Sequence, residues 1–225
     1  LVPENVFSCG GKWFPYPEYS DRQGWSRLLG KNAEYLIRAG EKYLDYKWRI
    51  VPATAYLAYE RTGERNIMQE PLSANRSALN ALMLAELAEG KGRFVDQLID
   101  GLWHLSNMPT WVLSAHLHRQ KSQRSLPDPR EQLIDLGSGG LAAQVAVAWH
   151  FFHETFDKVD PVISYVIQEA MKKQILDPYL NTAEYRANWW LGFELKESQV
   201  VNNWNPWCNA DVILCFLLME KDPQR

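Results

Sequence analysis

Apolar residues recur at helical intervals along most of the chain, and this periodicity limits the folds open to it. The clearest case is 161–176, with apolar side chains at positions 162, 163, 166, 167, 170, 171 and 175. Spacings of three and four place these side chains on one face of an α-helix. No stretch shows the alternation and hairpin turns that are typical of half-buried strands. The sequence therefore predicts an all-α fold.

Capping residues mark where the predicted helices begin and end. One helix starts near Pro52 and closes on Gly63, and another runs over 73–90 and closes on Gly90. Further helices are expected over 20–44, 92–106, 131–156, 160–176, 182–190 and from 206 onward. Glycines at 137, 139 and 140 are expected to loosen the helix over 131–156, and Asp160-Pro161 starts the helix that follows it.

Short connections between helices of similar length suggest how these elements pack. Because 92–106 follows 73–90 within two residues, the two helices are expected to form an antiparallel hairpin. Such pairs recur, so we expect an incomplete (α/α) toroid built from antiparallel helix hairpins. Residues 1–20, rich in Pro, Gly and aromatic residues, are expected to form an extended arm on a toroid domain over 21–225.

Charge and motif content exclude several classes of protein. A net charge of −3 argues against general nucleic-acid binding, and the best apolar run, 212–219, is too short to span a bilayer. No phosphate loop, dinucleotide fingerprint or Cys-x-x-Cys pair is present, so no cofactor is expected. His150 and His153 lie one turn apart beside Glu154 without an evident third ligand, so no metal site is expected. Cys208 and Cys215 are too far apart along one helix face to form a disulfide.

A basic segment and an excess of tryptophan point toward an acidic carbohydrate. Residues 116–130 carry four arginines and lysines against one acid, a local balance of +3, and face either solvent or an anionic ligand. The ten tryptophans offer flat faces for sugar rings or, alternatively, fill wide gaps between helices. Arg124, His116 and Trp111 are the candidate substrate-binding residues in this part of the chain.

The segment VVNNWNPWCN at 200–209 combines four asparagines with two tryptophans. Asn205-Pro206 is typical of a helix start, with Asn as N-cap and Pro at the first helical position. Asn202 and Asn203 are then free to supply neutral donors to a carboxylate, next to the free N–H groups of the helix. Asp135 and Asp211 are a possible pair of acids for glycoside hydrolysis, with capping or surface roles as the alternative.

Six segments together resemble the helical N-terminal domain of heparinase II/III-type proteins of Bacteroidetes. They are WFPYPEYSDRQGW, YERTGERNIMQEP, LAELAEGKGRFVDQLIDG, SLPDPREQLIDL, FFHETFDKVDPVIS and VVNNWNPWCN. The resemblance implies a polysaccharide lyase that cleaves uronic-acid-containing chains by β-elimination. In such an enzyme the uronate carboxylate is neutralised, and Tyr or His moves the protons. It also implies a periplasmic, secreted or cell-surface protein with an acidic polysaccharide as its partner.

Carried onto this sequence, the resemblance makes Asn203 the group that neutralises the carboxylate. Asn202, Asn205, Trp204 and Trp207 would line the groove, and Trp204 stands where some relatives have a catalytic His. The family's catalytic Tyr and its β-sandwich domain lie beyond the last residue, Arg225, so the chain alone is expected to be inactive. A non-catalytic glycan-binding domain and an α/α-barrel glycoside hydrolase are the alternatives.

Overall fold

The computed structural model describes residues 14–181, 188–192 and 201–222, and these contain helices and turns without a strand. The all-α prediction is therefore confirmed for the described part of the chain. The α-helices are α1 (Arg22–Leu29), α2 (Ala33–Glu41), α3 (Ala53–Thr62), α4 (Asn66–Glu89), α5 (Val95–Ser106), α6 (Leu136–Val159), α7 (Pro161–Met171), α8 (Asp177–Leu180) and α9 (Trp204–Met219). Short 3-10 helices are η1 (Gly30–Asn32), η2 (Ser114–Arg119) and η5 (Trp189–Leu191), and η3 (Lys172–Leu176) is a π-helical turn.

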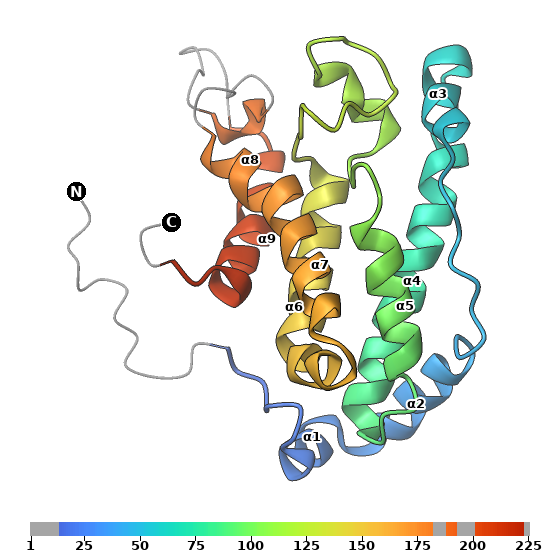
Figure 1. Cartoon of the computed structure of the whole chain (residues 1–225), viewed down its shortest axis with the longest axis vertical. Helices are drawn as coiled ribbons and strands as arrows, with labels where there is room; N and C mark the ends of the chain where they lie inside the picture. Colours follow the sequence, from blue (N-terminus) through green and yellow to red (C-terminus); the bar gives the residue numbers. More distant parts are fainter. Residues whose placement is uncertain (1–13, 182–187, 193–200, 223–225) are drawn as a thin grey trace, which may run out of the picture.

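Three long helices run in the same direction, and two others run back beside them (Figure 1). α4, α6 and α9 descend in the view, with α6 packed against α9, whereas α5 and α7 ascend. The helix starts of α6 and α9 therefore lie at the same end of the molecule as the long connection 107–135. α1 and α2 lie at the opposite end, beside the end of α4.

Local sequence signals account for several helix boundaries. Gly63 and Gly90 adopt the left-handed conformation after α3 and α4, where a side chain would be strained. Asp160 caps α7 by accepting a hydrogen bond from the Val162 N–H at 2.9 Å, with Pro161 at the first helical position. These three boundaries agree with the sequence-based expectation.

Several helices differ in extent from the prediction, and the first expected helix is divided by η1 into α1 and α2. α4 begins at Asn66 rather than at 73 and contains Pro71, which cannot donate to the carbonyl four residues earlier. Burial of Met68 and Leu72 on the α4 face keeps this first turn and a half helical. α6 begins at Leu136 rather than at 131, because Asp135 caps it there. The helix expected over 182–190 falls largely outside the described residues.

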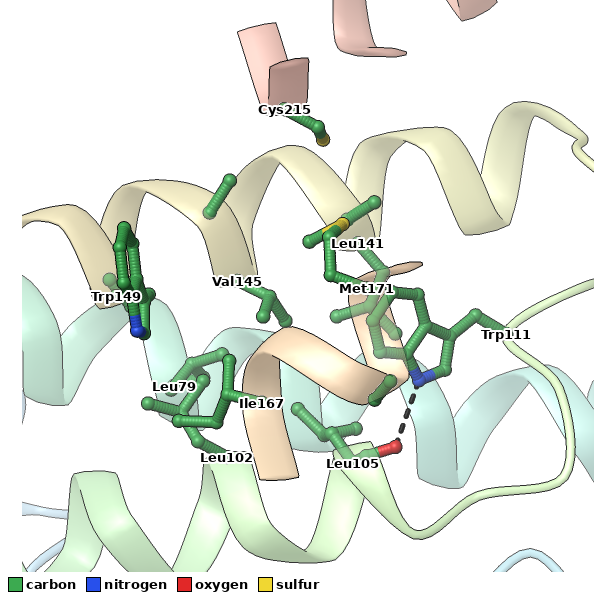
Figure 2. Close-up of a cluster of buried hydrophobic side chains, with 14 of the residues drawn as sticks. Leu79, Leu102, Leu105, Trp111, Leu141, Val145, Trp149, Ile167, Met171 and Cys215 are labelled. Atoms are coloured by element: carbon green, nitrogen blue, oxygen red, sulfur yellow. Dashed lines mark hydrogen bonds between the residues drawn. The ribbon is translucent and has the colours of Figure 1, made fainter. Parts of the chain in front are cut away.

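The core lies where α4, α5, α6, α7 and α9 meet. Figure 2 shows Leu141, Val145 and Trp149 of α6 surrounded by side chains from the other helices, and all the labelled residues are nearly or fully buried. Before α1, Phe14 packs on Phe151 of α6 with ring centroids 5.7 Å apart. The described part of the segment before residue 20 is thus anchored to the same core.

None of the described helices combines the length and apolar character that crossing a membrane requires.

Candidate functional site

A capping box at the start of α6 fixes the base of the candidate site. The buried Asp135 carboxylate accepts a hydrogen bond from the Ser138 N–H at 2.7 Å, and the Ser138 hydroxyl accepts one from the Asp135 N–H at 2.9 Å. The second carboxylate oxygen, Oδ2, accepts from the Leu113 N–H at 3.1 Å. Asp135 is only 2% exposed. The D-x-x-S spacing was a readable signal for this cap.

The same Asp135 oxygen holds His116, which is carried by η2. His116 Nδ1 lies 2.6 Å from Asp135 Oδ2. A carboxylate only accepts hydrogen bonds, so Nδ1 carries the proton and Nε2 of the neutral ring carries a lone pair. No described residue bonds to Nε2, and the His116 side chain is 19% exposed. The arrangement can therefore accept or return a proton at Nε2.

The asparagine segment begins α9 earlier than the sequence predicts. Asn203, not Asn205, precedes the first helical residue, and the Asn202 side chain accepts a hydrogen bond from the Trp204 N–H at 3.0 Å. The Asn205 amide instead donates to the carbonyls of Trp190 and Leu191 at 2.9 and 3.1 Å. Asn205 therefore fixes α9 to η5, and its assignment as the N-cap is wrong. The Asn203 side chain is exposed and makes no capping bond.

An aromatic row connects these residues. The Trp204 ring meets His116 edge-on at 4.7 Å between centroids and lies 5.4 Å from Trp189. The Arg119 guanidinium lies over Trp189, 5.2 Å from its centroid. Trp207, on the next turn of α9, is 58% exposed. The structure thus brings His116 and Trp204 together, 88 residues apart in sequence, and adds Arg119 and Trp189, which sequence reasoning missed because no local motif marks them.

Trp111 does not belong to the site, contrary to its assignment as a substrate-binding residue. It is 0% exposed, and its indole N–H donates to the Leu105 carbonyl at 2.9 Å (Figure 2). The ring packs near Leu141 and Met171 in the core. This tryptophan fills a gap between helices and has no surface to offer a ligand.

Arg124 is also committed within the protein. Its guanidinium pairs with Glu60 of α3 at 2.6 Å, and this hydrogen bond lowers the pKa of the Glu60 carboxyl. Arg130 pairs with Asp128 at 2.7 Å. The positive balance of the segment 116–130 is therefore partly cancelled by pairing, and the charge argument for Arg124 fails. A cavity of about 920 Å³ beside this segment has a lining of mixed charge, which includes Arg119, Lys172 and Lys173 as well as Glu169 and Asp177.

The glycoside hydrolase alternative loses its acid pair. Both Asp135 oxygens are occupied, so this residue has no free oxygen for a glycosidic bond and acts as the predicted cap. Asp211 lies in the middle of α9, and its Oδ2 atom is buried. Asp135 is therefore not available as one of the two acids that hydrolysis requires.

The two histidines of α6 and the two cysteines of α9 pack against other side chains of the protein. His153 stacks on Trp149 at 4.6 Å, and His150 meets Phe14 edge-on at 4.8 Å. The described ranges contain no group of three or more possible metal ligands. Cys208 and Cys215 are buried free thiols, and burial raises the pKa of Cys208 to about 12. Neither thiol is poised as a nucleophile.

Comparison with known proteins adds no assignment. No protein-family model matches the sequence, and no curated protein is significantly similar to it.

Proposed function

We propose that this chain is the helical part of a heparinase II/III-type polysaccharide lyase, arranged as an incomplete (α/α) toroid. Its site would hold one uronate ring of an acidic polysaccharide at the start of α9. The common direction of α4, α6 and α9, with α5 and α7 returning beside them, supports this arrangement (Figure 1). In a toroid of this kind the starts of the inner helices would face the groove, and the candidate site lies at the starts of α6 and α9.

The observation that carries the proposal is the uncommitted amide of Asn203 at the start of a 16-residue helix. Its side chain is exposed, and it has no capping bond that would have to break before a ligand binds. The first turn of α9 adds the positive end of the helix dipole. Its backbone N–H groups at 204, 205 and 207 are already bonded to Asn202 and Asn203, contrary to the expectation of free N–H groups there. An amide donor there can bond to a uronate carboxylate and stabilise the charge that develops when the C5 proton leaves.

The His116–Asp135 pair supplies the proton-transfer group that Trp204 lacks. Trp204 stands where some relatives have a catalytic histidine, and the ring of His116 lies 4.7 Å from it. With Nδ1 held by Asp135, Nε2 is available to take the C5 proton or to protonate the leaving oxygen. The other proton step would fall to the tyrosine that the family resemblance places beyond residue 225.

Binding and elimination are tested separately. We expect the 225-residue chain to bind heparosan or alginate oligosaccharides in a calorimetric titration and to bind neutral dextran oligosaccharides much more weakly. Asn203→Ala should weaken this binding at least tenfold. Asn32→Ala is the matched control, because Asn32 is also an exposed asparagine before a helix without a capping bond, at the other end of the molecule. Equal losses from both substitutions would contradict the assignment of Asn203.

A non-catalytic glycan-binding domain is the second candidate function. The exposed indole of Trp207 and the half-buried Trp204 favour it, because such faces stack on sugars without any chemistry. The full-length parent protein discriminates between the two. Formation of unsaturated uronate, followed by its ultraviolet absorbance, should fall by two or more orders of magnitude in His116→Ala if the protein is a lyase. A protein that binds without forming this product is a glycan-binding protein.

A further inference from the structure

A groove on another side of α6 contains polar groups that the candidate site does not use. α4, α6 and α9 border an open groove of about 590 Å³. Its polar lining consists of Ser73, Arg76, Ser77, Asn80 and Gln144, and Gly140 of α6 lies among them. The groove therefore offers one cation among neutral hydrogen-bonding groups.

Arg76 is the unusual member of this lining. Its side chain is half-buried, and burial lowers the pKa of its guanidinium while the charges of Asp211 and Asp135 raise it. No described residue accepts a hydrogen bond from the guanidinium or lies within ion-pair distance of it. A partly buried charge without a hydrogen-bonded partner is costly, so an acceptor brought by a ligand would be favoured.

Asp211 of α9 lies close to Gly140 but is not part of the groove lining. Its Oδ2 atom is buried and has no hydrogen-bond partner among the described residues. Burial raises the pKa of this carboxyl, and Arg76 opposes that shift. A methyl group placed on Gly140 would lie 3.0 Å from the Arg76 guanidinium and 3.8 Å from Asp211 Oδ2. The two side chains thus approach one point from two helices without pairing.

The glycines of α6 preserve this space. A methyl group on Gly139 would lie 3.3 Å from Asp211 Oδ2. Glycine inside a helix is destabilising relative to alanine, so two successive glycines need a local reason. Here that reason is the room they leave for Arg76 and Asp211.

We propose that this groove binds a hydroxy acid, a molecule with a carboxylate next to hydroxyl groups, such as a free sugar acid or a uronate unit of a polymer. The carboxylate would accept two parallel hydrogen bonds from Arg76. Neighbouring hydroxyls would bond to Asn80 and Ser77, which line the groove and are exposed. A simple inorganic anion would leave these neutral groups unused and would lie close to the Asp211 charge. This proposal does not rest on the lyase assignment.

Calorimetric titration of the Asn203→Ala variant of the 225-residue chain with D-glucuronate tests the proposal, because this variant lacks the uronate-binding amide proposed at the start of α9. D-glucose lacks the carboxylate and acetate lacks the hydroxyls, so each should bind at least tenfold more weakly. Arg76→Gln should abolish glucuronate binding, whereas Arg38→Gln, which changes an exposed arginine of α2, should not. Glucuronate binding that survives Arg76→Gln, or no binding at millimolar concentration, would overturn the proposal.

Gly140→Ala separates binding from folding. The added methyl group fills the point between Arg76 and Asp211, so glucuronate affinity should fall at least tenfold while the melting temperature does not fall. Unchanged affinity in this variant would contradict the proposed position of the ligand. Uronate oligosaccharides, titrated in parallel, distinguish the two kinds of ligand. If the groove binds a uronate unit of a polymer, an oligosaccharide should bind as tightly as free glucuronate. If it binds only a free acid, the oligosaccharide should bind more weakly. Asn203→Ala should leave glucuronate binding at this groove intact, so this proposal and the proposed function fail independently.

Discussion

The two ends of the helical body differ in whether their buried charged groups have hydrogen-bond partners. At the end of α4, the fully buried Glu86 carboxylate accepts hydrogen bonds from the Tyr19 hydroxyl at 2.6 Å and from the Gly92 and Phe94 N–H groups at 2.8 and 3.2 Å. Arg22 donates there to the Leu87 and Ala88 carbonyls at 2.5 and 3.2 Å, completing the end of the helix.

At the end that holds the starts of α6 and α9, comparable groups lack hydrogen-bond partners within the described part of the chain. Asp211 Oδ2 and the Arg76 guanidinium have no partner among the described residues, and the Asn203 amide is exposed without a capping bond. The buried Asp135 carboxylate, by contrast, has both oxygens bonded, and one of its partners is the imidazole of His116. The closed end, around Glu86, pairs its buried polar groups and is thereby stabilised. The open end, at the starts of α6 and α9, leaves these polar groups unpaired at some cost in stability.

Replacing the closed carboxylate should produce the largest effect. Glu86→Leu leaves three donors at the end of α4 without their acceptor, two of which are backbone N–H groups. We expect the free energy of unfolding to fall by about 3–5 kcal/mol, measured by urea denaturation. Asn203→Ala at the open end should change it by less than about 0.5 kcal/mol. Similar losses at both positions would remove the contrast between the two ends.

Two tryptophans allow a buried and an exposed ring to be compared directly. Trp111→Phe removes the indole N–H that bonds to the Leu105 carbonyl and leaves a void in the core. We expect a loss of about 2 kcal/mol in the free energy of unfolding. Trp207→Phe, at a position where the ring is 58% exposed, should cost less than about 0.5 kcal/mol. A larger loss of unfolding free energy in Trp207→Phe than in Trp111→Phe would contradict this prediction.

The contribution of Asp211 to stability should be visible in the pH dependence of the free energy of unfolding. Because its folded-state pKa is raised, the folded state holds the Asp211 proton between the ordinary carboxyl pKa and the raised value, where the unfolded state has lost it. Stability from this group is therefore present at low pH and is lost as pH rises through that window. Asp211→Asn should gain stability relative to the wild type over the same window and keep a constant difference above it. Urea denaturation at a series of pH values measures this difference, and a difference that falls with rising pH would contradict the raised pKa.

Gly140→Ala should have the smallest effect on stability. The new methyl group meets only the mobile end of the Arg76 side chain, and alanine favours the helix by up to about 1 kcal/mol. Thermal unfolding should show an unchanged or slightly raised melting temperature. A clear decrease would indicate that Arg76 is fixed in place and that the groove is closed rather than open.

Local signals predicted the helices better than the site. Gly63, Gly90 and Asp160-Pro161 mark helix boundaries because their effect depends on the backbone within one turn. The starts predicted at 73 and at Asn205 were wrong, since tertiary contacts outweigh local preference at both places.

The residues of the candidate site depend on contacts between distant segments. Arg124 was assigned to an anion by counting nearby charges, but its partner Glu60 lies 64 residues away. Trp111 could not be distinguished from a surface tryptophan without its packing, which Figure 2 shows. Asn203 and Trp204 were assigned from the composition of 200–209 and from the family resemblance, whereas Arg76 and Asp211 gain their interest only from their common approach to Gly140.

Mapping a bound ligand by NMR tests the proposed role of the open end most directly. In a titration of the isotope-labelled chain with uronate oligosaccharides, we predict shifts at the Asn203 side-chain amide, the Trp204 and Trp207 indoles and the His116 ring. The Tyr19 and Phe94 signals at the closed end should not move. The absence of any shift, or shifts centred on Glu86 and its partners, would contradict the conclusion that the open end is the ligand-binding end.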